Sequence, residues 1–326
     1  MRRREFIGLI GGAVTWPLAA RTQQLNKVPR IGVLWNGKSA ETHPYFQSLR
    51  NEFKRIGYPE GNLIFEDRFF NENFEIVDLL AKQLVDLKCD VLIGVTATAA
   101  LALRRATSTI SIVFAFNSNP VGSGLVSSLN HPGGNVTGIT HIGHEQAAKR
   151  VQLLIDTIPA LSSVALIWDS TPTNLFQNRV EVEETRTAAN QFGLSFEAFE
   201  CGSPETIEQA ISKASRFGAA ILGNSSWYIF AREQIAELAI ARRLAVIGSS
   251  DVFSDSGLPM SYGANWSAVV AGAAPLVKKI LEGAKPENIP VEEPTVFDLV
   301  FNLKTAEALG LHIPPITLAR ATRVIE

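Results

Sequence analysis

Cysteine is scarce in this sequence, and so are long apolar runs. Only Cys89 and Cys201 occur among 326 residues, and neither follows the apolar N-terminal stretch, where a lipid-anchored precursor needs one. The strand pattern described below places them in different lobes, so we expect two buried thiols and no disulfide. Beyond the N-terminus, no apolar stretch approaches the roughly 20 residues of a membrane span. We therefore expect no membrane anchor.

The sequence also has no large excess of positive or negative charge, and no recognisable catalytic motif. The formal net charge is only -2, which gives no reason to expect nucleic acid as a partner. We find no G-x-S-x-G elbow and no Cys–His pair that spacing alone would support. His141 and His144 are separated by Ile142 and Gly143, not arranged as H-E-x-x-H, which disfavours a metal site. We expect no enzyme activity, no metal and no cofactor.

One nucleotide-binding motif occurs in the wrong context. Gly32–Ser39 fits G-x-x-x-x-G-K-[ST], yet Gly32 lies inside an apolar run typical of a buried strand. Pro44 also falls where the phosphate-binding helix would already be under way. The sequence therefore does not favour nucleotide hydrolysis.

The first 22 residues have the pattern of a cleaved export signal. Arg2, Arg3 and Arg4 form a basic start, Phe6–Ala20 is apolar, and cleavage is expected near Thr22. The step Arg3-Arg4-Glu5-Phe6-Ile7 resembles the twin-arginine pattern, and a general secretory signal with three arginines is the alternative. Either route exports the chain, so we expect a periplasmic protein.

Short apolar runs alternate with amphipathic stretches through the rest of the chain. This alternation indicates an α/β fold with parallel sheets covered on both faces, and its restart after residue 160 indicates two Rossmann-like lobes. The expected strands are 30–35, 63–69, 90–95, 111–116 and 136–140, then 164–168, 194–199, 219–222 and 245–247. We assign residues 28–142 plus 258–290 to lobe 1 and 143–257 plus 295–326 to lobe 2. Several chain crossings then form a hinge that permits closure.

The carboxyl ends of these strands predict a ligand site. Ligands bind beyond the carboxyl ends of parallel strands, and two facing lobes bring those ends to one cleft. The predicted ligand-binding residues of the first lobe are Trp35, Asn36, Thr96, Ala97, Thr98, Phe116 and Asn117. Those of the second lobe are Trp168, Asp169, Asn174, Asn224, Ser225 and Trp227, with Tyr262 from a returning strand and Asp251 from the hinge side.

The chemistry of this set favours an organic anion with an aromatic part. Thr96 to Thr98 join the end of a strand to an Ala-rich helix, and the free N–H groups at the start of that helix would suit a carboxylate. The alternative is that Thr96 or Thr98 only caps the helix. The tryptophans either contact the ligand with their ring faces or fill packing gaps between loops and helices. Asp169 and Asp251 either take a ligand ammonium or cap helices.

Several segments carry a family resemblance. The most specific are His131–Ile139 (HPGGNVTGI) and Phe297–Leu311 (FDLVFNLKTAEALGL), with support from Thr96–Ala106, Pro120–Leu129 and Met260–Asn265. Over about residues 28–326 the chain resembles the ABC-transporter substrate-binding proteins of tryptophan and tyrosine type. Many members of that family have Gly-Asp-Pro where this chain has Asn117–Pro120, and Trp-Asn where it has Trp168-Asp169.

The resemblance implies a class I periplasmic-binding-protein fold and a solute-binding receptor of an importer. Such a receptor binds a small organic solute, here an amino acid or aromatic carboxylate, and presents it to the transmembrane subunits of an ABC permease. We expect it to act as a monomer. The alternatives are a ligand-sensing module that feeds a signalling system, or a sugar-type binding protein.

Overall fold

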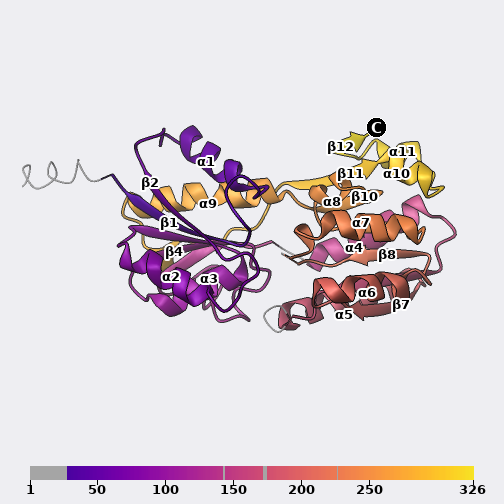
Figure 1. Cartoon of the computed structure of the whole chain (residues 1–326), viewed down its shortest axis with the longest axis horizontal. Coiled ribbons are helices and arrows are strands. Elements are labelled where there is room, and N and C mark those ends of the chain that lie inside the picture. The colour runs from indigo at the N-terminus through magenta and orange to yellow at the C-terminus, as the bar shows by residue number, and fades with distance from the viewer. Residues whose placement is uncertain (1–27, 142–143, 172–174, 226) are drawn as a thin grey trace, which may run out of the picture.

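The computed structural model describes residues 28–141, 144–171, 175–225 and 227–326. Two α/β lobes lie end to end along the long axis of the molecule (Figure 1). Each lobe has one sheet with helices on both faces, which confirms the predicted α/β fold with two Rossmann-like lobes. Among the described residues, no helix combines the length and apolarity needed to cross a bilayer.

The first lobe contains a wholly parallel sheet of strand order β2-β1-β3-β4-β5. Its strands are β1 (Arg30–Trp35), β2 (Ile64–Phe69), β3 (Val91–Val95), β4 (Ser111–Ala115) and β5 (Val136–Ile139). Helices α1 (Phe46–Arg55) and α9 (Trp266–Leu281) pack together on one face, while α2 (Val77–Asp86) and α3 (Ala97–Ala106) pack together on the other. Alternate residues of β3 therefore belong to different apolar clusters, Ile93 with α9 and Leu92 with α2 and α3.

The second lobe contains a seven-stranded sheet of order β12-β11-β10-β9-β8-β6-β7, in which only the β10–β11 pair is antiparallel. Its strands are β6 (Ser163–Trp168), β7 (Ser195–Glu200), β8 (Ala219–Leu222), β9 (Val246–Gly248), β10 (Met260–Ala264), β11 (Phe297–Asn302) and β12 (Arg323–Ile325). Its helices are α4 (His144–Thr157), α5 (Leu175–Gln191), α6 (Ile207–Ala214), α7 (Arg232–Ala241), α8 (Asp251–Asp255), α10 (Leu303–Ala308) and α11 (Pro315–Leu318). Cys89 and Cys201 are free and buried, one in each lobe.

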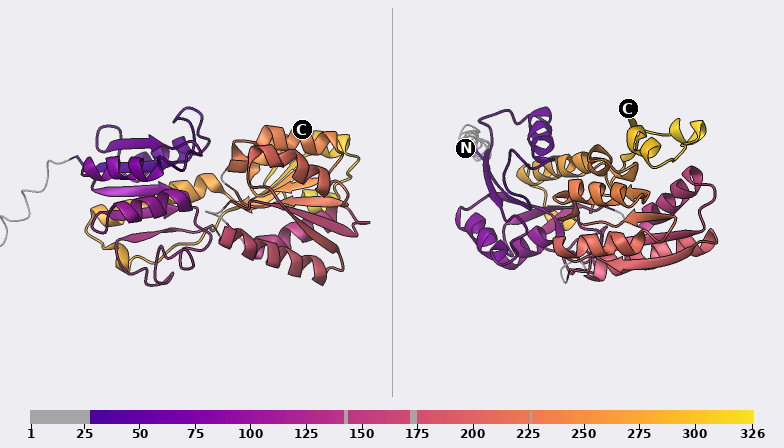
Figure 2. Two further views of the ribbon diagram at one scale, coloured as in Figure 1. Left: turned by 60° about the horizontal axis from the view of Figure 1, so that its bottom comes forward. Right: turned by 45° about the vertical axis from the view of Figure 1, so that its right-hand side comes forward.

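The chain crosses between the lobes after β5, after β10 and before β11. Helix α9, orange in Figures 1 and 2, lies within the first lobe although it follows strands of the second. The crossing segments bond to one another: the amide of Thr140 donates to the carbonyl of Glu292 (2.9 Å), and that of Asn265 to the carbonyl of Val296 (2.8 Å).

One expectation about this region needs correction. The segment from residue 258 is expected in lobe 1, but β10 belongs to the second sheet because it pairs with β9 and, antiparallel, with β11. The crossing therefore follows Ala264.

Candidate functional site

Each lobe has one point where its strand order reverses, and the two points face each other. In the first sheet this point lies between β1 and β3, and in the second between β6 and β8. Loops that leave such neighbouring strands in opposite directions open a crevice at their carboxyl ends. A pocket of about 770 Å³, partly open to solvent, lies between these loops.

Residues from both lobes and from the crossings line this pocket. They are mainly aromatic rings, hydroxyls and amides. The lining residues are Asn36, His43, Pro44, Tyr45, Val95, Thr96, Ala97, Thr98, Phe116, Ser118, His141, Asn178, Asn224, Ser225, Ile229, Phe230 and Trp266. None of them carries a carboxylate, an ammonium or a guanidinium group.

The structure brings seven of the sequence-predicted residues together at this pocket. They are Asn36, Thr96, Ala97, Thr98, Phe116, Asn224 and Ser225. All seven follow the last residue of a strand: β1, β3, β4 or β8. Such positions project over the edge of the sheet, which is why they reach the space between the lobes.

The predicted tryptophans lie elsewhere. Trp35 and Trp168 are the final residues of β1 and β6, and both pack into apolar cores. A residue still within the strand points to one face of the sheet, under a helix, whereas the next residue points over the edge. Trp227 is likewise buried, with its ring centroid 4.5 Å from that of Tyr228.

Three other predicted residues, Asn117, Tyr262 and Asp251, also lie outside the pocket lining. Asn117 is fully buried and its side chain donates to Ser123 Oγ (3.1 Å). Tyr262 stacks on Phe297 with centroids 6.3 Å apart, and Asp251 begins α8. Asn174 falls outside the described residues.

The start of α3 supplies hydrogen-bond donors to the pocket. Thr96 caps the helix, since its Oγ1 accepts a hydrogen bond from the amide of Ala99 (3.1 Å). The amides of Ala97 and Thr98 have no acceptor within the helix, and the helix dipole adds positive potential there. Gly94 allows this approach, because a Cβ at that position would lie 2.6 Å from the amide nitrogen of Ala100. An anionic group fits this position.

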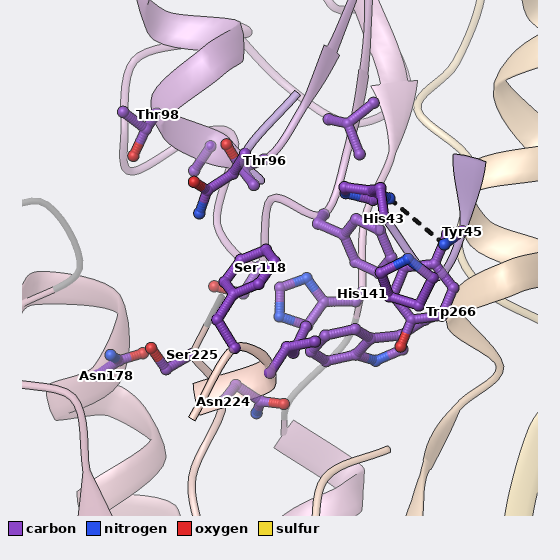
Figure 3. Close-up of a pocket in the computed structure, with 17 residues that line it drawn as sticks. His43, Tyr45, Thr96, Thr98, Ser118, His141, Asn178, Asn224, Ser225 and Trp266 are labelled. Carbon is purple, nitrogen blue, oxygen red and sulfur yellow. Dashed lines mark hydrogen bonds between the residues drawn. The ribbon is translucent and has the colours of Figure 1, made fainter. Parts of the chain in front are cut away.

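An aromatic cluster that the strand pattern did not predict forms another wall. The ring centroid of Trp266 lies 5.0 Å from that of Phe116 and 6.0 Å from that of Tyr45, and His141 lies 5.9 Å from Phe116 (Figure 3). Phe116 has a φ of +62°, an unfavourable conformation for a bulky residue, of the kind found at binding sites. Of the other three residues, Tyr45 directly precedes α1, Trp266 is the first residue of α9, and His141 lies in the crossing after β5.

Both histidines of the pocket are neutral at pH 7. Burial lowers the pKa of His43 to about 4. Burial, aided by the positive charge of Arg150, lowers the pKa of His141 to about 4 as well. The Nδ1 atom of His141 is buried and has no hydrogen-bond partner among the described residues.

Two carboxylates lie behind the second-lobe wall. Asp169 is fully buried and accepts a hydrogen bond from Ser225 Oγ (2.7 Å). Glu181 on α5 accepts hydrogen bonds from Asn224 and pairs with Arg150 on α4 (3.0 Å). No sequence pattern indicates the Arg150–Glu181 pair, because charged residues on helices are mostly exposed.

A third carboxylate approaches the cleft from the first lobe. The amide of Glu72 donates to Asn36 Oδ1 (3.0 Å), and the Asn36 side chain donates to the Glu72 carboxylate. Burial, and then the negative charge of Asp169 in the other lobe, raises the pKa of Glu72 to about 7.

Comparison with known proteins places this geometry in context. Residues 42–325 match the family described as ABC transporter substrate binding protein. A tyrosine-binding protein of Clostridioides difficile (strain R20291) is 22% identical over 278 residues, which are 83% of this chain and 79% of that protein.

Two solved structures resemble the whole fold. One is an ABC domain from Streptococcus pneumoniae in complex with L-Trp, with a TM-score of 0.84 and 24% sequence identity. The match covers 92% of this chain and 100% of that chain. A conserved domain protein from Vibrio cholerae has a TM-score of 0.84 at 28% identity and covers 91% of this chain and 100% of its own. These likenesses confirm the class I periplasmic-binding-protein fold.

Proposed function

The chain belongs to the ABC transporter substrate-binding protein family, and we propose that it is the periplasmic receptor of an importer for an aromatic amino acid or a related aromatic carboxylate. The observation that carries this proposal is the composition of the pocket. A helix start rich in free N–H groups, Ala97 and Thr98, adjoins an aromatic wall of Tyr45, Phe116 and Trp266, and none of the described lining side chains is ionised.

The chemistry of the pocket suits such a ligand. It combines aromatic and aliphatic walls with a few convergent polar groups, as small-molecule sites usually do. A carboxylate at the start of α3 would receive charge-assisted hydrogen bonds, which contribute about 1.5–3 kcal/mol each. An aromatic ring against Phe116 and Trp266 would add about 0.5–1.5 kcal/mol per ring pair beyond its buried area.

The mechanism is capture by lobe closure. Three crossings join the lobes, and their mutual hydrogen bonds at Thr140–Glu292 and Asn265–Val296 favour a bending motion over independent rotation. Asn36, Thr96 and Phe116 belong to the first lobe and Asn224 and Ser225 to the second, so a ligand that touches both sets stabilises the closed form. No covalent bond of the ligand changes.

The proposal also includes how the receptor is exported, where it acts and which partner it meets. The basic and apolar N-terminal segment directs export, and cleavage near Thr22 releases a monomer into the periplasm. The closed form then docks on the transmembrane subunits of an ABC permease. Relatives described as a tyrosine-binding protein and as an L-Trp complex support an aromatic amino acid as the solute.

A thermal-shift panel tests the proposal. The chain without its first 22 residues is heated with amino acids, aromatic acids, sugars and nucleotides. A cognate ligand at 100 times its Kd stabilises the fold by about 2.7 kcal/mol, which is a rise of several degrees in Tm. A rise with aromatic amino acids or aromatic acids supports the proposal. A rise confined to sugars, or a nucleotide hit with phosphate release, contradicts it.

A further inference from the structure

We infer that the hydroxyl groups of Tyr45 and Ser250 form a brace between the lobes, which stabilises their closed arrangement, and that Asp251 is the positioning residue that makes Ser250 the acceptor in this brace. The inference rests on the lobe closure of the proposed function and goes beyond it, because it assigns part of the stability of the closed form to a direct contact between the lobes. The brace therefore acts on the equilibrium between open and closed forms and does not select the ligand.

The Tyr45 side chain belongs to the first lobe, and its hydroxyl faces the second. Tyr45 directly precedes α1, and its ring centroid lies 6.0 Å from that of Trp266. The charged side chains that act on its hydroxyl, Arg232, Asp251 and Asp255, all belong to the second lobe. Burial raises the pKa of Tyr45 above its ordinary value, so the hydroxyl stays protonated and can donate a hydrogen bond.

A hydrogen bond joins the two lobes at this point. The hydroxyl oxygen of Tyr45 lies 3.4 Å from Oγ of Ser250, the residue that precedes α8 in the second lobe. Tyr45 is 3% exposed and Ser250 is 1% exposed, so water does not compete freely for either hydroxyl. The distance is long for an O–H···O bond, which makes this a brace of moderate strength.

Asp251 fixes the direction of this hydrogen bond. Ser250 Oγ donates its single proton to Asp251 Oδ1 (2.9 Å), and a carboxylate only accepts. Only lone pairs remain on Ser250 Oγ, so Tyr45 is the donor. The guanidinium group of Arg323 on β12 lies 4.0 Å from Asp251 Oδ2 and 2.6 Å from Asp255 Oδ1. The C-terminal strand therefore supports the carboxylate on which the brace depends.

The brace lies beside one of the chain crossings. Trp266, which packs against Tyr45, begins α9 directly after this crossing. A Cβ on Gly263 would lie 2.0 Å from the carbonyl oxygen of Ser249, so the backbone next to Ser250 packs closely on β10 just before the crossing. Rotation of one lobe about the crossing changes the distance between the two hydroxyls, because different lobes carry them. The arrangement that brings them within hydrogen-bond reach also brings residues of both lobes around one pocket.

Loss of the brace should lower the closed fraction of the ligand-free chain. The net contribution of a hydrogen bond corresponds to a change of roughly 2- to 13-fold in an equilibrium constant. The apparent Kd of a ligand rises as the binding-competent fraction of the protein falls. The expected change is therefore the same for every ligand of the pocket, whereas loss of a ligand contact affects different ligands differently.

Tyr45→Phe and Ser250→Ala test the brace, since each removes one hydroxyl and little else. The Ser250 side chain makes no capping hydrogen bond to α8, so Ser250→Ala removes no cap. In calorimetric titrations, each variant should raise the Kd of L-tryptophan and that of L-phenylalanine by the same factor, about 3- to 10-fold. The double variant should lose no more than either single variant, because both remove the same bond. Asp251→Ala should give a smaller loss in the wild-type background and none in Tyr45→Phe.

The arrangement of the lobes can also be measured without a ligand. Lys82 on α2 and Lys213 on α6 are exposed on different lobes, whereas the native thiols of Cys89 and Cys201 are buried. Spin labels on Lys82→Cys/Lys213→Cys therefore report the distance between the lobes by double electron–electron resonance.

The two brace variants are then compared with a matched control in this labelled background. We expect Tyr45→Phe and Ser250→Ala to broaden the ligand-free distance distribution and to shift it away from that of the chain saturated with L-tryptophan. Tyr58→Phe is the control, since it removes a first-lobe hydroxyl that does not line the pocket. It should leave the distance distribution unchanged and both Kd values within about twofold of wild type.

The outcomes separate the brace from the proposed function. If Tyr45→Phe weakens binding and Ser250→Ala does not, or if Tyr45→Phe changes the two Kd values by different factors, the Tyr45 hydroxyl contacts the ligand and the brace is refuted. Distance distributions that stay unchanged in both variants also refute it. If no aromatic amino acid binds the wild-type chain while both variants still broaden the ligand-free distribution, the proposed function fails and the brace stands.

Discussion

The start of α3 can be altered without disturbing the helix, and this gives the sharpest prediction. Ala97 is the first helical residue, and Thr96 before it has an extended ψ of 163°. Proline is favoured at the first helical position, because its φ already suits a helix and the N–H it lacks makes no intrahelical bond. Ala97→Pro therefore removes one N–H donor from the pocket and leaves every hydrogen bond of the helix intact.

The expected loss follows from the kind of hydrogen bond that is removed. A bond from this amide to a ligand carboxylate contributes about 1.5–3 kcal/mol, so the Kd should rise about 10- to 150-fold. The free energy of unfolding without ligand should stay within about 1 kcal/mol of wild type, because proline also restricts the unfolded chain.

Calorimetric titration with L-phenylalanine and with L-phenylalanine amide is the assay. L-phenylalanine amide lacks the carboxylate, so we expect it to bind wild type more weakly than L-phenylalanine does. Its Kd should change little in Ala97→Pro. An unchanged Kd for L-phenylalanine in a folded variant would refute the carboxylate site at α3. An equal loss for both ligands would show that proline disturbs the pocket by another route.

Three further predictions concern stability. Gly94→Ala should cost about 1–3 kcal/mol, measured by urea denaturation, because its Cβ would lie 2.6 Å from the backbone of α3; an unchanged midpoint contradicts this packing. Burial lowers the pKa values of His43 and His141 to about 4, so the unfolded chain takes up protons first and stability should fall as the pH drops from about 6.5 to 4. Melting curves of His43→Asn/His141→Asn should show a clearly smaller fall, because each tenfold difference in proton affinity between the folded and unfolded chain is equivalent to about 1.4 kcal/mol; a fall as large as that of wild type would contradict this assignment. Arg150→Met should cost about 3–5 kcal/mol because Glu181 stays buried without its cation, and Arg150→Met/Glu181→Gln should recover part of this loss in the same denaturation assay.

The sheets could be predicted well from the sequence because their signal is local. Runs such as Ile31–Trp35 and Val91–Val95 are apolar throughout, as expected for strands buried on both faces. Once the strands are known, the first one or two residues after each strand lie at the edge of the sheet. Asn36, Thr96 and Asn224 reach the pocket for this reason.

The remainder of the site depends on packing that no local pattern encodes. Trp35 and Trp168 lie one residue too early along their strands to reach the pocket, and each points into a core. Trp266 and His141 reach the pocket because of the path of the crossings, which depends on the antiparallel pairing of β10 with β11. The Arg150–Glu181 pair joins α4 and α5 and could be found only in three dimensions.

The central claim is that the chain binds one molecule of an aromatic amino acid between its lobes and leaves it unchanged. Titration calorimetry of the chain lacking residues 1–22 with L-tryptophan, L-tyrosine and L-phenylalanine, followed by mass spectrometry of the recovered ligand, tests this claim most directly. The account predicts saturable binding of one molecule per chain for at least one of the three, with a micromolar or lower Kd and an intact ligand. Absence of saturable binding by all three, or recovery of a chemically altered compound, would contradict it.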